Sequence, residues 1–377
     1  MERSRLRDLG VQIGELPPGE KNAITDVEGV MVGQTTLIEG QGALQPGQGP
    51  VRTGVSVILP HAGNLFRDKV SAAVYTLNGF GKALGFEQVR ELGVIESPLA
   101  LTNTLNVGLV ADALVQYSIL QNPDIGIRTG TVNVIVGETN DGYLNDIQGR
   151  HVHTEHVLAA LEKASSGQVA EGSVGAGTGT VCFGWKGGIG TASRILPAAQ
   201  GGFTIGALVQ SNFGCSRELL VSGVPVGRYL SPPANIADGA STQPDAPEQG
   251  SVMIILATDA PLDARQLGRL CLRSAAGLAR TGSIYGHGSG DFVIAFSTTR
   301  RFQHRPGSLV QAQASLVDEA RAMSGLFAAV VESVEEAVLN SLCRADTMVG
   351  RDAHMAYGLP LDDLVQVLER FPFLIRD

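Results

Sequence analysis

The chain has 377 residues, of which 44% are hydrophobic and 17% charged, enough for one large domain or about two to three ordinary ones. Its formal net charge of −9, with no basic run longer than Thr299-Arg300-Arg301, argues against a nucleic-acid partner. The first residues lack the apolar core of a signal peptide, and no apolar run approaches the ~18 residues that span a bilayer. We therefore expect a cytoplasmic protein with no membrane partner.

Strands are predicted where short, continuous apolar runs are rich in β-branched residues and are bounded by Gly, Pro or Asp. Such runs suit strands that are covered on both faces, as in sheets sandwiched between other layers. The predicted strands cover residues 55–59, 132–136, 203–209, 252–257 and 292–296.

Helices are predicted between these strands, where apolar residues recur three and four positions apart. They cover residues 104–121, 156–164, 263–280 and 309–344. The third should end at Gly282, because glycine commonly terminates helices. The fourth is predicted to be two helices broken near Ser324-Gly325. Strands and helices that alternate along the whole chain indicate the α/β class.

Residues 231–249 form a proline-studded linker with one β-branched aliphatic residue and no aromatic residue. Such a stretch cannot bury enough apolar surface to offset the entropy lost on ordering it. The part of the chain after it has too few predicted strands to fold comfortably alone. We therefore predict a single domain, residues 1–377, that contains the linker.

The linker runs directly into Gly250-Ser251 and the predicted strand at 252–257. A long loop without structure of its own in a compact chain is usually functional or disordered. If the Gly250–Ser251 bond is cut, Ser251 gains a free α-amino group beside its hydroxyl. A hydroxyl with a neighbouring amine is a nucleophile with its own base, so this junction predicts an enzyme that matures by cutting itself.

Polar side chains follow two other predicted strands. Residues 137–146 hold three carboxylates and two amides directly after the strand at 132–136, and this end of a strand is where α/β proteins bind ligands. A calcium loop is the rival interpretation, although the DxDxDG register is missing. Asn212 follows the strand at 203–209, where its amide could donate to a developing oxyanion.

The segment 286–291 reads Gly-His-Gly-Ser-Gly-Asp and lacks the GxSxG spacing of a nucleophile elbow. On a strand, Ser289 and Asp291 would lie on the same face, because side chains alternate with a period of two. A hydroxyl and a carboxylate on a glycine-rich backbone suit a substrate site. A plain glycine-rich turn is the alternative.

Two further motifs are interpreted structurally. The glycines of residues 175–180 and 186–191 do not have the spacing of a P-loop or a dinucleotide fingerprint, which favours tight turns and close packing. Residues 151–156, His-Val-His-Thr-Glu-His, do not match HExxH and are expected to form the exposed start of a helix. We therefore expect no metal and no cofactor.

Several segments together resemble one family, the L-aminopeptidase/D-esterase group, which includes the β-peptidyl aminopeptidases. The resemblance extends from about residue 5 to the C-terminus and is specific through the joint order of its segments. These are residues 22–30, 96–104, 172–179 and 186–191, together with Gly250-Ser251 and the stretch 288–291.

The resemblance implies a four-layer α/β/β/α sandwich, similar to that of N-terminal-nucleophile hydrolases but with a different chain order. It implies self-cleavage between Gly250 and Ser251 into an α chain, residues 1–250, and a β chain, residues 251–377. It further implies a homotetramer that releases N-terminal residues from short peptides, amides or esters.

The resemblance also assigns roles. Ser251 would be the nucleophile, with its freed amine as the general base. Ser289 and Asp291 correspond to the serine and the acid that position the hydroxyl and the amine of Ser251. Asp291 has one methylene less reach than the Glu of some relatives. Asn212 corresponds to the side-chain donor to the oxyanion.

Glu138 corresponds to the carboxylate that binds the free amine of the substrate, which would make the enzyme an aminopeptidase. Asn140 aligns with an aromatic hydroxyl of some relatives, so the second oxyanion donor is open and Tyr143 is only a weak replacement. The preference for L, D or β residues is open as well, because it depends on the shape of the pocket.

Two other classes of function are alternatives to a self-cleaving aminopeptidase. A non-catalytic binding or assembly protein could use the same fold with an uncleaved linker, because a fold does not guarantee an activity. A nucleotide-binding enzyme is a more distant alternative.

Overall fold

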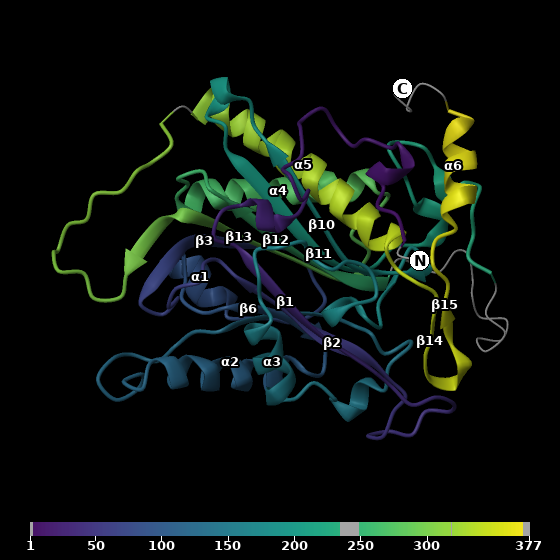
Figure 1. Cartoon of the computed structure of the whole chain (residues 1–377), viewed down its shortest axis with the longest axis horizontal. Helices are drawn as coiled ribbons and strands as arrows, with labels where there is room; N and C mark the ends of the chain where they lie inside the picture. Colours follow the sequence, from purple (N-terminus) through teal and green to yellow (C-terminus); the bar gives the residue numbers. More distant parts are fainter. Residues whose placement is uncertain (1–2, 234–248, 318, 372–377) are drawn as a thin grey trace.

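Two β-sheets stack face to face, and helices cover both outer faces, in a computed structural model that describes residues 3–233, 249–317 and 319–371 (Figure 1). The four layers follow the order α/β/β/α, as the family resemblance implies. The predicted linker at 231–249 falls mostly outside the described residues. Among the helices that are described, none is long and apolar enough to cross a membrane.

Each sheet is mostly antiparallel and contains one parallel pair of strands, β6–β7 in the smaller sheet and β12–β13 in the larger. The five-stranded sheet has the order β1 (Met31–Glu39), β2 (Val51–Leu59), β6 (Leu99–Asn103), β7 (Ile135–Thr139) and β4 (Ala83–Leu84). The six-stranded sheet has the order β10 (Gly188–Ile195), β11 (Thr204–Asn212), β12 (Gln249–Thr258), β13 (Gly288–Gln303), β3 (Asp68–Gly79) and β5 (Val94–Ile95). Two short hairpins complete the strands, β8 (Val181–Cys182) with β9 (Trp185–Lys186) and β14 (Met348–Val349) with β15 (Met355–Ala356).

The long helices lie in pairs on the outer faces of the sheets (Figure 1). The pair α2 (Val107–Gln121) and α3 (Thr154–Glu162) covers the five-stranded sheet. The pair α4 (Ala264–Arg280) and α5 (Glu319–Cys343) covers the six-stranded sheet. Two shorter helices are α1 (Phe86–Leu92) and α6 (Leu361–Glu369).

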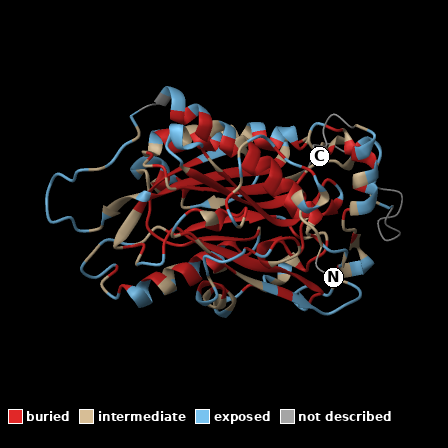
Figure 2. Cartoon of the chain, turned by 45° about the horizontal axis from the view of Figure 1, so that its top comes forward, coloured by how far each residue is buried: buried red, intermediate tan, exposed pale blue. Residues whose placement is uncertain are grey.

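Three apolar cores separate the four layers, and the strands are buried along most of their length (Figure 2). The central core lies between the sheets, where Leu101 and Ile135 belong to one sheet and Met253 and Ile294 to the other. Strands in this position are covered on both faces, which explains why their sequences are continuously apolar rather than alternating.

All five predicted strands are present. The prediction at 132–136 begins early, since β7 starts at Ile135. The residues before it are held by side-chain bonds instead of a strand ladder: the Asn133 N–H donates to Glu96 Oε1 (2.8 Å), and Asn133 Nδ2 donates to the Gly85 carbonyl (3.0 Å).

Three of the predicted helices correspond to α2, α3 and α4, and α4 shows both of its end signals. The side chain of Asp263 accepts a hydrogen bond from the Gln266 N–H (2.7 Å) at the start of the helix. Gly282 has a φ of 107° just beyond the end, a conformation that favours glycine.

The prediction of two helices across 309–344 is wrong. Residues 309–317 are not helical, and α5 runs without interruption through Ser324 and Gly325. Ser324 satisfies its hydroxyl within the helix by donating to the Ala320 carbonyl (2.9 Å). A Cβ on Gly325 would lie 2.2 Å from Gln200 Oε1, so this glycine allows close packing rather than a break.

Strands from both sides of the predicted linker share the six-stranded sheet. β11 precedes the linker in sequence, and it pairs with β12, which follows it. The two parts of the chain therefore contribute strands to one sheet; the single domain of residues 1–377 stays a prediction. Cleavage at Gly250–Ser251 stays a prediction.

Candidate active site

Three neighbouring strands of the six-stranded sheet bring the predicted residues to one place. Asn212, the last residue of β11, pairs with Ser251 of β12, and Ser251 pairs with Gly290 of β13. Residues far apart in sequence thus become neighbours through strand register alone.

The hydroxyl of Ser251 lies where two N–H donors converge. Its side-chain oxygen accepts hydrogen bonds from the backbone N–H of Asn140 (3.2 Å) and from Asn212 Nδ2 (3.4 Å). Ser251 is only 4% exposed. Because Asn140 follows β7 of the five-stranded sheet, both sheets contribute to the surroundings of Ser251.

The amide of Asn212 is oriented by a second contact. Its Oδ1 accepts a hydrogen bond from the backbone N–H of Val181 (3.0 Å). With the oxygen held on that side, the NH₂ group must face Ser251. The amide is thus fixed before any substrate arrives, as a preorganised oxyanion donor requires.

The second donor to the Ser251 hydroxyl is a backbone group, the N–H of Asn140. Tyr143 stacks on His354 with ring centroids 4.6 Å apart, and it is not one of the described residues that line the cavity beside Ser251. The side chain of Asn140 forms a hydrogen bond within its own loop, where its Oδ1 accepts from the Gly142 N–H (2.9 Å). Sequence reasoning had no signal for this donor, because every residue except proline carries a backbone N–H.

A buried carboxyl anchors the loop that presents the Asn140 N–H. Asp141 is 1% exposed, and its Oδ1 accepts from Asn145 Nδ2 (3.0 Å). Burial raises the pKa of Asp141 to about 7, against the lowering effect of its hydrogen bonds to Thr53 and Asn145. The loop is therefore fixed from inside the protein.

Gly250 is constrained sterically. A Cβ at this position would lie 2.2 Å from the carbonyl oxygen of Asn212 and 2.6 Å from the Cα of Phe213. Only glycine lets β12 approach β11 this closely next to Ser251.

Ser289 and Asp291 lie on β13 directly beside the Gly250–Ser251 junction. Ser289 pairs with Gly250 in the strand register and Asp291 pairs with Val252, so the two residues lie on either side of Gly290, the partner of Ser251. Because side chains alternate along a strand, those of Ser289 and Asp291 lie on the sheet face of Val252, opposite that of the Ser251 side chain. The Ser289 hydroxyl donates to Asp291 Oδ1 (2.6 Å), and both side chains are buried. This confirms that the two side chains lie on the same face of the strand.

Asn78 of β3, which sequence reasoning missed, holds the segment that leads into Ser289. Its Nδ2 donates to the carbonyl oxygens of Gly286 (3.0 Å) and Ser289 (2.5 Å). Its contacts join positions more than 200 residues apart, so no local pattern could have revealed them.

Glu138, near the end of β7, is a buried carboxylate held by two hydrogen bonds. Its Oε1 accepts from the Lys82 backbone N–H (2.9 Å), and its Oε2 accepts from the Thr104 hydroxyl. Burial raises the pKa of Glu138, while the Thr104 hydrogen bond and the charge of Lys82 act in the opposite direction. Each carboxylate oxygen retains a further lone pair for a ligand.

One cavity connects Ser251 with Glu138, and we call it the Ser251 cavity. Its volume is ≈ 430 Å³, which suits a small ligand. The residues that line it come from both sheets and from the glycine-rich segments: Gly79, Phe80, Gly81, Lys82, Thr104, Glu138, Asn140, Gly250, Ser251 and Gly288.

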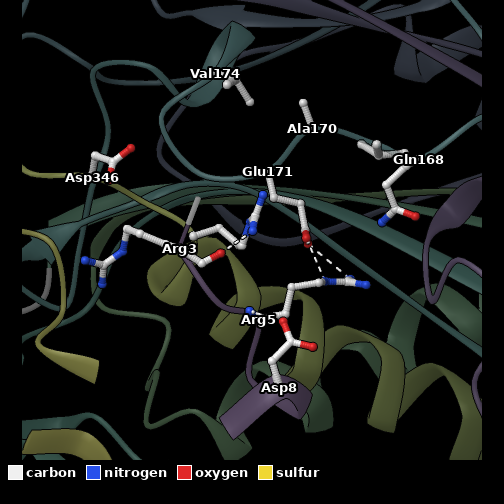
Figure 3. Close-up of a pocket in the computed structure, with 10 residues that line it drawn as sticks. Arg3, Arg5, Asp8, Gln168, Ala170, Glu171, Val174 and Asp346 are labelled. Atoms are coloured by element: carbon white, nitrogen blue, oxygen red, sulfur yellow. Dashed lines mark hydrogen bonds and ion pairs between the residues drawn. The ribbon is translucent and has the colours of Figure 1, made fainter. Parts of the chain in front are cut away.

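A second and larger cavity, the Arg5 cavity, lies elsewhere and has a volume of ≈ 520 Å³ (Figure 3). Its charged groups are bound to the protein itself. Arg5 pairs with Glu171 (Nε to Oε2, 2.7 Å), and Arg3 Nε donates to the Cys343 carbonyl (2.8 Å). These contacts tie the N-terminal segment to the end of α5, so we assign this cavity a structural role.

Comparisons with known proteins find similar proteins over nearly the whole chain. The model of peptidase family S58 matches residues 22–356. The chain is 41% identical to the beta-peptidyl aminopeptidase BapA of Sphingosinicella microcystinivorans, over 98% of this chain and 93% of that protein. It is also 41% identical to the enzyme of the same name from Sphingosinicella xenopeptidilytica, over 98% of this chain and 92% of that protein.

Two solved structures are similar over nearly the whole length. A beta-aminopeptidase of a Burkholderia species matches with a TM-score of 0.88 at 41% identity, over 97% of this chain and 99% of that one. The L-aminopeptidase D-Ala-esterase/amidase of Ochrobactrum anthropi matches with a TM-score of 0.87 at 37% identity, over 98% of this chain and 99% of that one. The latter is described as a prototype of the serine aminopeptidases and as a variant of the Ntn hydrolase fold.

Proposed function

Because this chain belongs to peptidase family S58 and is an aminopeptidase, we propose that Ser251 is its nucleophile, first in self-cleavage and then in hydrolysis. One observation carries the proposal. Two N–H donors converge on the buried Ser251 hydroxyl, at the wall of a cavity that also contains the carboxylate of Glu138. The comparisons do not favour a non-catalytic role.

Self-cleavage would use the peptide bond next to the nucleophile. The hydroxyl oxygen of Ser251 attacks the carbonyl carbon of Gly250, its proton passes to the Ser251 nitrogen, and the C–N bond breaks to leave an ester. Water then hydrolyses the ester, which releases the Gly250 carboxylate and restores the hydroxyl. The products are an α chain, residues 1–250, and a β chain that begins with the free amine of Ser251.

In the mature enzyme, the freed amine acts as the general base. An α-amino group has a pKa of about 7.7–8.0, close to working pH, which suits proton transfer. It takes the proton from the hydroxyl as the oxygen attacks the substrate carbonyl, and then gives a proton to the leaving amine. Water repeats the attack on the acyl-enzyme and releases the product.

The oxyanion of each tetrahedral intermediate would be stabilised by Asn212 Nδ2 and the Asn140 N–H. Ser289 and Asp291 lie on the neighbouring strand, on either side of the residue that pairs with Ser251. On the support of the family resemblance, we assign them the role of holding the hydroxyl and the new amine in position. The substrate's own ammonium group would pair with Glu138, which limits the enzyme to N-terminal residues of short peptides, amides or esters.

N-terminal sequencing together with a denaturing gel tests the proposal. The wild type should give two bands, about two thirds and one third of 39.4 kDa, and the smaller should begin Ser-Val-Met-Ile. The Ser251→Ala variant should remain one intact band and release no p-nitroaniline from a β-alanyl anilide. Ser165→Ala, at an exposed serine, is the control and should be cleaved and active. An uncut wild-type chain with full activity would overturn the mechanism.

We also propose that the αβ units assemble into a homotetramer in the cytoplasm, on the support of the family resemblance alone. Light scattering of the purified enzyme and fractionation of the source cells would test the two parts separately. A monomer in solution, or a protein found outside the cytoplasm, would reject the corresponding part.

A further inference from the structure

The Ser251 cavity contains one positive and one negative side chain. Of the ten described residues that line it, only Lys82 and Glu138 carry a charge at neutral pH. The remaining lining residues are glycines, a phenylalanine, hydroxyl residues and an asparagine. The proposed function uses Glu138 and leaves Lys82 without a role.

Lys82 and Glu138 are neighbours within the cavity. The Lys82 backbone N–H donates to Glu138 Oε1 (2.9 Å), and the chain can run this close because residue 81 is glycine. A Cβ on Gly81 would lie 3.0 Å from the same oxygen. The charge of Lys82 also lowers the pKa of Glu138, so the ammonium and the carboxylate are within each other's field.

The Lys82 ammonium lies in the field of Glu138 but forms no ion pair with any described residue. Within the described part of the chain, Lys82 forms no ion pair, whereas Lys69 pairs with Glu96 and Lys21 with Asp26. Lys82 is exposed and is one of the residues that line the cavity. A lysine in this position has its three donors available for an anionic group of a ligand.

The position of Lys82 indicates which part of the substrate it meets. Under the proposed function, Glu138 binds the ammonium of the N-terminal residue, so Lys82 faces that same residue and not the leaving group. A substrate with an ammonium alone would experience repulsion from Lys82. A carboxylate on the N-terminal residue would compensate this repulsion and gain a charge-assisted hydrogen bond.

We propose that this enzyme prefers substrates whose N-terminal residue carries a carboxylate near its amine, that is, aspartyl residues linked through the α or the β carboxyl. The inference rests on the proposed function. In this inference Lys82 sets the preference. Glu138 binds the amine of the substrate's N-terminal residue, and Lys82 binds its carboxylate.

The test compares two matched pairs of p-nitroanilides, β-alanyl with β-aspartyl and alanyl with α-aspartyl. The members of each pair differ only by one carboxylate. In the wild type, kcat/KM should be at least about tenfold higher for the aspartyl member of one pair or both, as expected for a hydrogen bond between charged groups. Which pair shows the preference distinguishes the two linkages.

Substitution of Lys82 sharpens the test. Lys82→Met should reduce the ratio of aspartyl to alanyl kcat/KM about tenfold, and Lys82→Glu should invert it. The wild-type ratio should also fall as salt concentration increases, since salt screens exposed charges but does not alter shape. Lys163→Met, at an exposed lysine on the end of α3, is the matched control and should keep the wild-type ratio.

The outcomes separate this inference from the proposed function. A wild type that hydrolyses the alanyl anilides but does not prefer either aspartyl anilide would overturn the inference alone. An unchanged ratio in both Lys82 variants would do the same. A wild type that hydrolyses none of the four substrates would overturn the proposed function as well.

Discussion

The two cavities of this protein differ in what their charged groups contact. The Arg5 cavity is the larger, at ≈ 520 Å³ against ≈ 430 Å³, and it contains more charge. Yet its charges are used inside the protein: Glu171 accepts from Arg5 and from the Thr191 N–H (2.8 Å), and Arg5 Nη1 donates to the Lys21 carbonyl (3.1 Å). Figure 3 shows Arg5 and Glu171 facing each other.

In the Ser251 cavity, the polar groups still have capacity for a ligand. The contacts at the Ser251 hydroxyl are long, at 3.2 and 3.4 Å, and come from groups oriented by other bonds. Donors that are held in place but form only long hydrogen bonds can bind a substrate oxygen without reorganisation of the protein. Size and charge alone would favour the Arg5 cavity, whereas the state of the hydrogen bonds favours the Ser251 cavity.

The largest effect is expected at Asn212. If the Ser251 cavity is catalytic, Asn212→Ala should lower kcat by about 10²–10³-fold, the usual cost of removing an oxyanion donor. The substitution also affects self-cleavage, so kcat should be expressed per mole of cleaved chain, with the β-alanyl anilide as substrate.

The matched control truncates an amide in the other cavity. Gln168 is exposed there, and its Nε2 donates to the Lys21 carbonyl at 3.3 Å. Gln168→Ala should keep kcat within about twofold of the wild type, as for most surface substitutions. Equal kcat values for the two variants would contradict the proposal that the Ser251 cavity, and not the Arg5 cavity, is catalytic.

Removal of a cation should destabilise the protein strongly in the Arg5 cavity and hardly at all in the Ser251 cavity. Arg5→Met leaves Glu171 buried without its partner and should reduce the free energy of unfolding by about 3 kcal/mol, the lower end for a broken buried pair because Arg5 is partly exposed. Lys82→Met should change it by less than about 0.5 kcal/mol, because Lys82 is exposed and forms no ion pair within the described part of the chain. Urea denaturation measures both values.

The loss in Arg5→Met should depend on pH. Burial raises the pKa of Glu171 from 4.5 to about 7, and Arg5 opposes that rise, so its removal raises the pKa further. The folded variant then holds a proton that the unfolded chain releases, and stability falls as pH rises from the unfolded pKa through the folded one. The difference from the wild type should be larger at pH 8 than at pH 5. Equal differences at the two pH values would contradict the assignment.

The success of the sequence predictions also differs between regions of the molecule. The continuously apolar strands were found because burial on both faces leaves a strong local signal. The strands β1 and β3 were not found, since both mix buried and exposed positions without a clear period. The strands β6 and β10 were not found either, because they are buried but interrupted by polar residues or glycines. The break at Ser324-Gly325 was wrong because the packing of Gly325 against Gln200 cannot be seen in the sequence.

At the site, the residues with distinctive chemistry were predicted, and those that act through position were not. Ser251, Asn212 and Glu138 were identified from their side chains, their places after strands and the family resemblance. The position of the Asn140 N–H depends on backbone geometry. The hydrogen bonds from Asn78 to the segment that leads into Ser289 depend on long-range strand pairing. Such features become visible only when the strand register is known.

The smallest effect is expected at Thr104, whose hydroxyl donates to Glu138. This hydrogen bond lowers the pKa of Glu138, so Thr104→Val should raise it. A higher pKa leaves less of the carboxylate ionised at acidic pH, and the ionised form is the one that binds the substrate ammonium. The acid limb of the kcat/KM profile due to Glu138 should therefore move to higher pH.

The shift should lower kcat/KM on the acid side by about fivefold, the equivalent of a hydrogen bond of about 1 kcal/mol. The limb due to the Ser251 amine, near its own pKa, should stay in place, because Thr104 bonds to Glu138 and not to Ser251. Thr299→Val is the control, since that hydroxyl donates to the Asp259 carbonyl (2.8 Å), away from the residues that line the Ser251 cavity. If the profile of Thr104→Val coincides with that of the wild type, Glu138 does not bind the substrate amine, and the Ser251 cavity loses the feature that makes it an aminopeptidase site.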